Sequence, residues 1–234
     1  MLKDKNIIVG VSGGIAAYKA VDLVSRLKKQ RANVEVIMTE HATKFVSPLS
    51  FQTLALNPVY LDMFKEPRNF DVEHISLAEK ADLFIIAPAT ANIIGKISNG
   101  IADDLLTTTI MATKAKVVFS PAMNTNMYLN PIVERNMANL KELGYEFIKP
   151  GTGMLACQTY GPGRMAEPSD IVEYIINSFY NKDLLGRKIV ITAGPTIEPI
   201  DPVRYMTNHS SGKMGYKIAE EAERRGAEVV LITG

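Results

Sequence analysis

The chain has 234 residues, of which 47% are hydrophobic and 22% are charged, a balance that argues against disordered and fibrous classes. Its 26 basic and 25 acidic residues leave a formal charge of +1, which gives no sign of a nucleic-acid-binding surface. The single cysteine, Cys157, cannot form an internal disulfide. No apolar run reaches the ~18 residues that cross a bilayer, and no signal peptide precedes the first strand-like run. We therefore expect a cytoplasmic protein.

Short apolar, β-branched runs predict strands in chain order. They cover residues 7–11, 34–38, 83–87, 116–120 and, more weakly, 145–148. Several are apolar at consecutive positions, which suits strands that are covered on both faces of a parallel sheet. Amphipathic patterns predict helices over residues 17–29, 101–111 and 132–143. This alternation predicts an α/β fold with a doubly wound parallel sheet, in which ligands bind at the carboxyl ends of the strands.

The same pattern starts again after a predicted closing helix at residues 171–180. Two strands, at 188–192 and 228–232, flank a predicted helix at 213–225. Two strands and one helix are too few to bury a sizeable core. The predicted organisation is therefore a domain over residues 1–180, a linker over 181–187, and the first βαβ part of a second α/β domain over 188–234.

The first strand runs into Gly10-Val11-Ser12-Gly13-Gly14, and a helix follows at once. The hydrolase nucleophile elbow has the same Gly-x-Ser-x-Gly spelling, but it normally follows several strands. A dinucleotide turn, with Glu40 on the ribose, is a second alternative, although Ser12 stands where its fingerprint has a glycine. Small residues at a helix N-terminus favour a cradle for one phosphate, and a plain turn is the remaining alternative. Thr39 is either a further ligand of that phosphate or an ordinary N-cap.

Small and polar residues also follow two later strands. Ala89, Thr90 and Asn92 leave room for a flat ring system that the two polar side chains could bind, or they form an N-capped loop. Asn124 and Asn126 follow the strand at 116–120. Their amides suit a carboxylate or amide ligand, or they belong to a plain turn. These strand ends are the second and third candidate parts of a site.

The remaining chemical candidates are histidines and the cysteine. His74 can exchange a proton near neutral pH, and His41 and His209 are comparable to it on composition alone. The glycine-rich segment 151–165 is predicted to be neither helix nor strand. Its Cys157 is either a reactive group on a flap or a small buried hydrophobe. The spacing of these residues predicts no metal site.

Taken together, these motifs resemble one family. The residues that carry the resemblance are 10–19, Glu73-His74-Ile75, 88–92, 121–124 and the segment around Cys157. They are similar to the FMN-dependent phosphopantothenoylcysteine decarboxylases, which belong to the homo-oligomeric flavin-containing cysteine decarboxylases. Residues 192–204 and 208–215 are similar to the start of phosphopantothenate–cysteine ligase, commonly fused behind the decarboxylase in bacteria. The resemblance thus implies the front part of a bifunctional protein of coenzyme A biosynthesis, with a truncated ligase domain.

The resemblance also implies roles for single residues. FMN would be held by Ser12, Gly13, Thr39, Ala89, Thr90 and Asn92; catalysis would involve His74, Asn124 and Cys157; the substrate would contact Asn124, Met127 and Ala156; and the ligase segment would use Asn208 and Lys213. The implied reaction is FMN-dependent decarboxylation of 4'-phosphopantothenoylcysteine to 4'-phosphopantetheine by a homotrimer or larger homo-oligomer. CTP and Mg²⁺ would serve the complete ligase domain, so no ligase turnover is expected from these 234 residues alone.

The sequence departs from the family pattern at Thr90, Ile93, Tyr128 and Gln158, none of which removes a reacting group. The alternatives are a decarboxylase that acts on a peptidyl cysteine, a flavin prenyltransferase, and a flavin-binding regulatory subunit without catalysis. The ligase-like tail argues against the first two. The joint presence of His74, Asn124 and Cys157 argues against the third.

Overall fold

The computed structural model describes residues 2–63, 73–154 and 160–234. The chain divides into two compact units, Met1–Tyr174 and Ile175–Gly234. Each unit is a separate α/β structure and is described by itself. Among the described residues, no helix combines the length and the apolar character that crossing a membrane requires.

The first unit is built on a six-stranded parallel sheet with the order β3-β2-β1-β4-β5-β6. Its strands are β1 (Asn6–Val11), β2 (Asn33–Met38), β3 (Val59–Tyr60), β4 (Leu83–Ala89), β5 (Lys116–Pro121) and β6 (Glu146–Phe147). The long strands are the predicted apolar runs, and β4 is buried along its whole length, as expected for a strand covered on both faces. The predicted doubly wound parallel sheet is confirmed.

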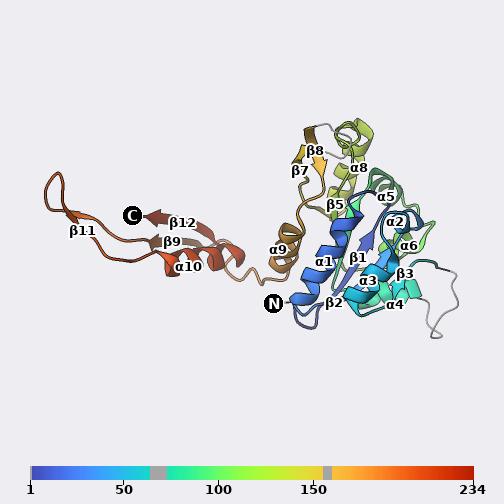
Figure 1. The fold of residues 1–234 in the computed structure, drawn as a ribbon, viewed down its shortest axis with the longest axis horizontal. Coiled ribbons are helices and arrows are strands. Elements are labelled where there is room, and N and C mark those ends of the chain that lie inside the picture. The colour runs from blue at the N-terminus through green and yellow to red at the C-terminus, as the bar shows by residue number, and fades with distance from the viewer. Residues whose placement is uncertain (1, 64–72, 155–159) are drawn as a thin grey trace. The chain divides into compact units, whose positions relative to one another are not determined.

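Helices pack around this sheet (Figure 1). They are α1 (Ala17–Lys29), α2 (Glu40–Thr43), α3 (Pro48–Ala55), α4 (Glu73–Lys80), α5 (Ala91–Ser98), α6 (Leu105–Ala112), α7 (Thr125–Tyr128) and α8 (Pro131–Glu142). A further helix, α9 (Pro168–Ser178), spans the boundary between the two units. The helix predicted from Ile101 begins four residues later, because Asp104 caps α6 through the backbone N–H of Thr107, while the Thr107 side chain returns to the Asp104 backbone. Residues 91–98 form α5, a helix that was not predicted from the sequence.

The core of the first unit lies where aromatic side chains of neighbouring strands meet the helices. Phe84 on β4 and Phe119 on β5 are fully buried, and they pack with Ile94 of α5 and Leu106 of α6. Burying side chains of this size contributes roughly 1.5–3 kcal/mol each. This packing makes the sheet a rigid base on which the loops at its carboxyl edge are held.

The segment 151–165 corrects one prediction. Its described residues form an antiparallel pair, β7 (Gly151–Met154) with β8 (Tyr160–Arg164), although glycine and proline predicted neither helix nor strand. The β8 strand is held by packing on the loop after β5 rather than by its own propensity: a Cβ on Gly161 would lie 2.6 Å from Oγ1 of Thr125. Ala156 and Cys157 lie outside the described residues.

The second unit has the predicted βαβ arrangement. Strands β9 (Lys188–Ala193) and β12 (Glu228–Thr233) pair in parallel, and α10 (Lys213–Arg224) packs on them. A short antiparallel pair that the sequence did not predict, β10 (Glu198–Pro199) with β11 (Tyr205–Met206), interrupts the connection between β9 and α10. The small core consists of Ile191, Ala219, Ala222 and Ala227.

Candidate cofactor and active site

A cavity of about 1020 Å³ opens at the carboxyl edge of the main sheet. Its lining comes from residues 12–16, 18 and 19 after β1, residues 39–41 after β2, Thr90–Ile93, Lys96 and Asp104 around α5 and α6, Ala122–Asn124 and Met127 after β5, and Met154 with residues 163–165 on the β7–β8 pair. The sheet order reverses between β1 and β4, which is where open α/β sheets bind their ligands. The volume is that of a site for a cofactor-sized molecule.

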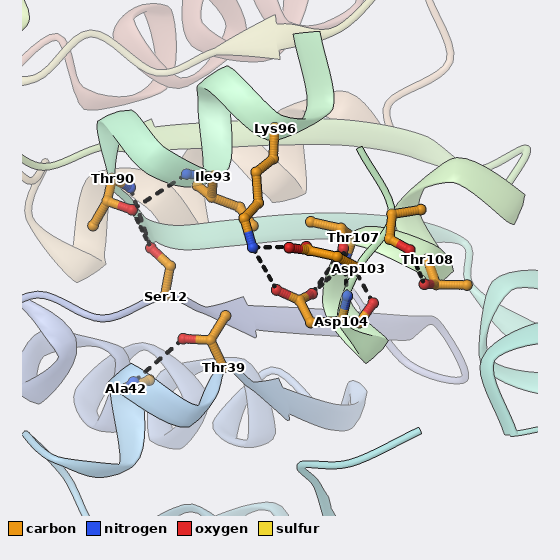
Figure 2. Close-up of polar contacts among 11 residues, drawn as sticks. Ser12, Thr39, Ala42, Thr90, Ile93, Lys96, Asp103, Asp104, Thr107 and Thr108 are labelled. Carbon is orange, nitrogen blue, oxygen red and sulfur yellow. Dashed lines mark hydrogen bonds and ion pairs between the residues drawn. The ribbon is translucent and has the colours of Figure 1, made fainter. Parts of the chain in front are cut away.

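Ser12 joins the ends of the two central strands. Its hydroxyl donates to the carbonyl oxygen of Pro88 at 2.7 Å and accepts from the backbone N–H of Thr90 at 3.2 Å. Thr90 in turn caps α5 through the N–H of Ile93, so these side chains form a continuous contact across the sheet (Figure 2). Ser12 is 2% exposed. The Ser12 hydroxyl therefore holds the turn after β1 to the end of β4.

The start of α1 follows this turn. Ala16 occupies the N-cap position, and no side chain of the described residues caps this end of the helix. The N–H groups of Ala17 and Lys19 donate to the carbonyl oxygens of Gly14 at 2.9 Å and Ala16 at 3.0 Å, so the partial positive charge of the helix start, rather than these two groups, favours an anion. Since residues 12–16 also line the cavity, this turn is suited to an anion such as a phosphate.

Gly13 lets a second wall approach the turn. A Cβ at this position would lie 2.4 Å from Cβ of His41, closer than real carbon atoms come. The contact places α2 and its N-cap, Thr39, beside the phosphate turn, and Thr39, Glu40 and His41 all line the cavity. Thr39 accepts a hydrogen bond from the N–H of Ala42 at 3.3 Å, so the two roles considered for this residue are compatible (Figure 2).

The loop after β4 supplies the next wall. Thr90 and Asn92 line the cavity, whereas Ala89 is fully buried as the last residue of β4 and is not part of the lining. Small residues at this point bring backbone close to the cavity. The wall is therefore polar at two predicted positions, with the small side chain of Ala91 between them.

The loop after β5 faces the phosphate turn from the other side. Asn124 and Met127 line the cavity, and Asn126 does not. Asn124 also caps α7, because its Oδ1 accepts from the N–H of Asn126 at 2.8 Å. Gly163 allows β8 to reach this loop: its φ is +123°, and a Cβ would lie 2.3 Å from the carbonyl oxygen of Met123.

Some predicted residues are placed elsewhere. His74 is the second residue of α4 and does not belong to the lining of this cavity. Asn208 and Lys213 lie in the second unit. Lys213 starts α10 and lines a groove of about 780 Å³, whereas Asn208 Oδ1 accepts from the N–H of Ser210 at 2.8 Å. Among the described residues, no three His, Cys, Asp or Glu side chains gather as a metal site would require.

The structure also adds charged residues that sequence reasoning missed. Lys96 of α5 binds Asp103 at 2.7 Å and Asp104 at 3.4 Å at the side of the cavity (Figure 2). Burial alone lowers the pKa of Lys96, but the two carboxylates outweigh it and raise that pKa. The hydrogen bond from Lys96 lowers the pKa of Asp103. The Asp-x-x-Thr motif at residues 104–107, which is typical of a helix N-terminus, could have revealed the charged residues beside it.

A parallel sheet with a small-residue turn at a helix start, a partly polar wall and a cavity at its switch point is typical of nucleotide- and flavin-binding α/β proteins. The chain belongs to the Flavoprotein family, whose profile matches residues 1–180, and residues 184–234 match the DNA/pantothenate metabolism flavoprotein C-terminal domain. The whole chain is 54% identical to the coenzyme A biosynthesis bifunctional protein CoaBC of Bacillus subtilis and 47% identical to that of Escherichia coli. It spans 58% of the length of each of these relatives.

Solved structures show the same fold. One is a PPC decarboxylase mutant complexed with pantothenoylaminoethenethiol, 35% identical, with a TM-score of 0.68, covering 74% of this chain and 97% of that one. Another is the FMN binding protein AtHal3, 34% identical, with a TM-score of 0.66, covering 76% of this chain and 97% of that one. Epidermin biosynthesis protein EpiD from Staphylococcus aureus is 29% identical, with a TM-score of 0.63, covering 73% and 99% of the two chains.

Proposed function

We propose that this chain binds FMN and decarboxylates 4'-phosphopantothenoylcysteine to 4'-phosphopantetheine, a step of coenzyme A biosynthesis. The observation that carries the proposal is the cavity at the β1/β4 switch point, which unites the phosphate turn, the partly polar wall and Asn124. The similarity to a PPC decarboxylase and to CoaBC proteins supports the choice of substrate.

The residues present fit FMN. The uncapped start of α1 suits the phosphate, and Gly13 admits Thr39 to the same corner. Thr90 and Asn92 provide hydrogen-bonding groups beside a wall of small residues for a planar ring. FMN supplies a reversible acceptor and donor of two electrons, so that the cysteinyl unit can lose CO2 from an oxidised state and regain its electrons afterwards.

The protein's own groups would position the substrate and move protons. Asn124 projects from a capped turn on a rigid strand end, which suits an orienting role toward the substrate's carboxylate and amide groups. His74 is proposed to assist deprotonation and Cys157 to return a proton. Met127 and Ala156 are proposed to contact the substrate.

We propose a homo-oligomer, with the trimer known for the family as the leading case, in which His74 serves the cavity of a neighbouring copy. Its support is the position of His74 outside the cavity lining of its own chain. Co-expressed His74→Asn and Asn124→Ser chains should recover activity, because a mixed oligomer then contains sites with both intact residues. Mixed oligomers as inactive as either parent would refute sharing of the site.

For the second unit we propose the first part of a CTP-dependent phosphopantothenate–cysteine ligase domain, with Asn208 and Lys213 as ligand contacts and Mg²⁺ serving the complete domain. The family profile over residues 184–234 supports this assignment. The proposed division is a decarboxylase domain at 1–180, a linker at 181–187 and the ligase segment at 188–234. A cytoplasmic location fits the single cysteine.

The function is tested by flavin absorbance of the purified protein and by CO2 release from phosphopantothenoylcysteine. In Cys157→Ser, an oxidised, decarboxylated product should accumulate; full return to the saturated thiol would remove Cys157 from its proposed role.

Asn124→Ser keeps a capping side chain but loses the amide, so turnover should fall by about 100-fold. The matched control is Asn126→Ser, whose side chain lies outside the cavity lining and whose turnover should be unchanged. A colourless protein that does not bind FMN would refute the proposal.

A further inference from the structure

A buried lysine lies beside the phosphate turn. Lys19 is the third residue of α1, and its side chain is 8% exposed. Lysine is rarely buried unless it is paired. Its Nζ donates to the carbonyl oxygen of Met165 at 3.3 Å and to Oε1 of Glu167 at 2.8 Å, and Lys19 also lines the cavity. The ammonium group therefore ties α1 to the chain that leaves β8.

The same stretch of chain is tied to the opposite wall. The N–H of Met123 donates to the carbonyl oxygen of Gly163 at 2.9 Å, and Oγ1 of Thr125 donates to that of Pro162 at 2.9 Å. Lys19 thus acts on the loop after β5 through β8, although it does not touch that loop directly. Hydrogen bonds therefore join the start of α1, the β7–β8 pair and the loop after β5 to one another.

Glu167 is the centre of this connection. Its Oε1 accepts from Lys19 and lies 3.1 Å from a guanidinium nitrogen of Arg164. The hydrogen bond from Lys19 lowers the pKa of the Glu167 carboxyl, so the carboxylate is ionised at neutral pH. Because the lysine of this ion pair is shielded from water, the pair holds its geometry better than a fully exposed ion pair does.

We propose that Lys19 is a positioning residue: its bonds to Met165 and Glu167 fix the β7–β8 hairpin and the loop after β5 at a set distance from the phosphate turn. This spacing determines the width of the substrate side of the cavity, where Asn124 lies. The role of Lys19 in positioning these segments follows from the geometry alone. Its expected effect on turnover rests on the proposed decarboxylase function.

The test compares Lys19→Met, Glu167→Ala and the double variant in the FMN-loaded protein, with Lys29→Met as the matched control. Lys29 lies in the last turn of the same helix and is exposed. The Glu167 side chain is 50% exposed, so its truncation opens no cavity, whereas Lys19→Met keeps an apolar side chain of similar length and leaves no unpaired charge at the buried position. Lys19→Arg keeps the charge and should restore part of the effect.

Backbone hydrogen exchange over residues 151–154 and 160–165 should rise about tenfold or more in each single variant, the effect of losing a hydrogen bond to a charged group. The double variant should exceed the larger single effect only slightly, because both changes break one connection. Unchanged exchange in Glu167→Ala, or fully additive effects, would overturn the positioning role. Lys29→Met should match the wild type.

In steady-state assays, Lys19→Met should raise KM for phosphopantothenoylcysteine about tenfold, while the dissociation constant of FMN changes by less than about threefold. A loss of FMN affinity as large as the rise in KM would overturn the proposal, because it would mean that Lys19 contacts the cofactor directly. If the wild-type protein released no CO2, the proposed function would fail, and the exchange data would still decide the positioning role.

Discussion

Replacing Gly13 by alanine tests the packing that forms the phosphate corner. The new Cβ would lie 2.4 Å from Cβ of His41 and 3.0 Å from its carbonyl carbon, where ordinary contact begins at 3.4 Å. The turn and α2 must therefore separate by about 1 Å, and overpacking of this kind costs about 1–3 kcal/mol. Since Thr39 moves with α2, we expect the dissociation constant of FMN to rise about 5- to 150-fold.

The assay is fluorescence titration of FMN against the cofactor-free protein, with Gly95→Ala in α5 as the matched control. A Cβ on Gly95 would lie 3.7 Å from Nδ2 of Asn136, which is ordinary contact, and Gly95 does not line the cavity, so this variant should bind nearly as the wild type does. The double variant Gly13→Ala with His41→Gly removes the colliding atom and should recover part of the affinity. Equal losses in the Gly13 and Gly95 variants would refute the collision as the cause.

Further predictions concern the packing around the same site and its stability. Gly163→Ala places a Cβ 2.3 Å from the carbonyl oxygen of Met123 at a φ of +123°, so the midpoint of urea unfolding should fall by an amount equivalent to about 2 kcal/mol or more. Asp104→Ala removes the N-cap of α6 and should cost about 1 kcal/mol in thermal unfolding. Burial raises the pKa of Glu146, but hydrogen bonds from Tyr174 and a lysine outweigh it and lower that pKa below 4.5. Its contribution to the free energy of unfolding is therefore full above pH 4.5 and is lost as the pH falls through the lowered value, so Glu146→Gln should cost more at pH 6 than at pH 3.

For each of these three predictions, one result would contradict the reasoning. Gly144→Ala, at a φ of +90° with no atom within 4 Å of the added Cβ, isolates the backbone cost; a loss as large as that of Gly163→Ala would remove the contact with Met123 from the explanation. An unchanged melting temperature in Asp104→Ala would show that the first turn of α6 is held by packing. An equal cost of Glu146→Gln at both pH values would contradict the lowered pKa of that carboxyl.

The sequence predicted the parts of the fold that depend on burial. The strand β4 is a continuous apolar run, and β1, β2 and β5 are apolar at most positions, a pattern that suits strands covered on both faces. No helix was predicted at α5, because only its polar start, Thr90 to Asn92, was interpreted, either as a binding loop or as an N-capped loop. Its formation depends on packing of Ile93, Ile94 and Ile97 into the core, which local propensity does not reveal.

The candidate site was predictable where a residue directly follows a strand. Ser12, Thr39, Thr90 and Asn124 reach one cavity because parallel strands end at one edge of the sheet. Lys19 was not predictable, since a basic residue in an amphipathic helix is expected to face water, and its carboxylate partner is 148 residues away in the chain. The β7–β8 hairpin was missed because contacts with the loop after β5 outweigh its poor strand propensity.

The connection between α1 and the chain after β8 has a consequence for biosynthesis. During translation, Lys19 is synthesised long before Glu167. A nascent chain that has reached β5 therefore already contains the phosphate turn, but it does not yet contain the carboxylate that pairs with the Lys19 ammonium group. The Lys19 ammonium group stays hydrated until Glu167 has been synthesised, so the wall formed by the β7–β8 pair is fixed last. The width of the substrate side of the cavity is therefore set only after the chain that follows β8 has been made, whereas the phosphate turn precedes it by well over a hundred residues.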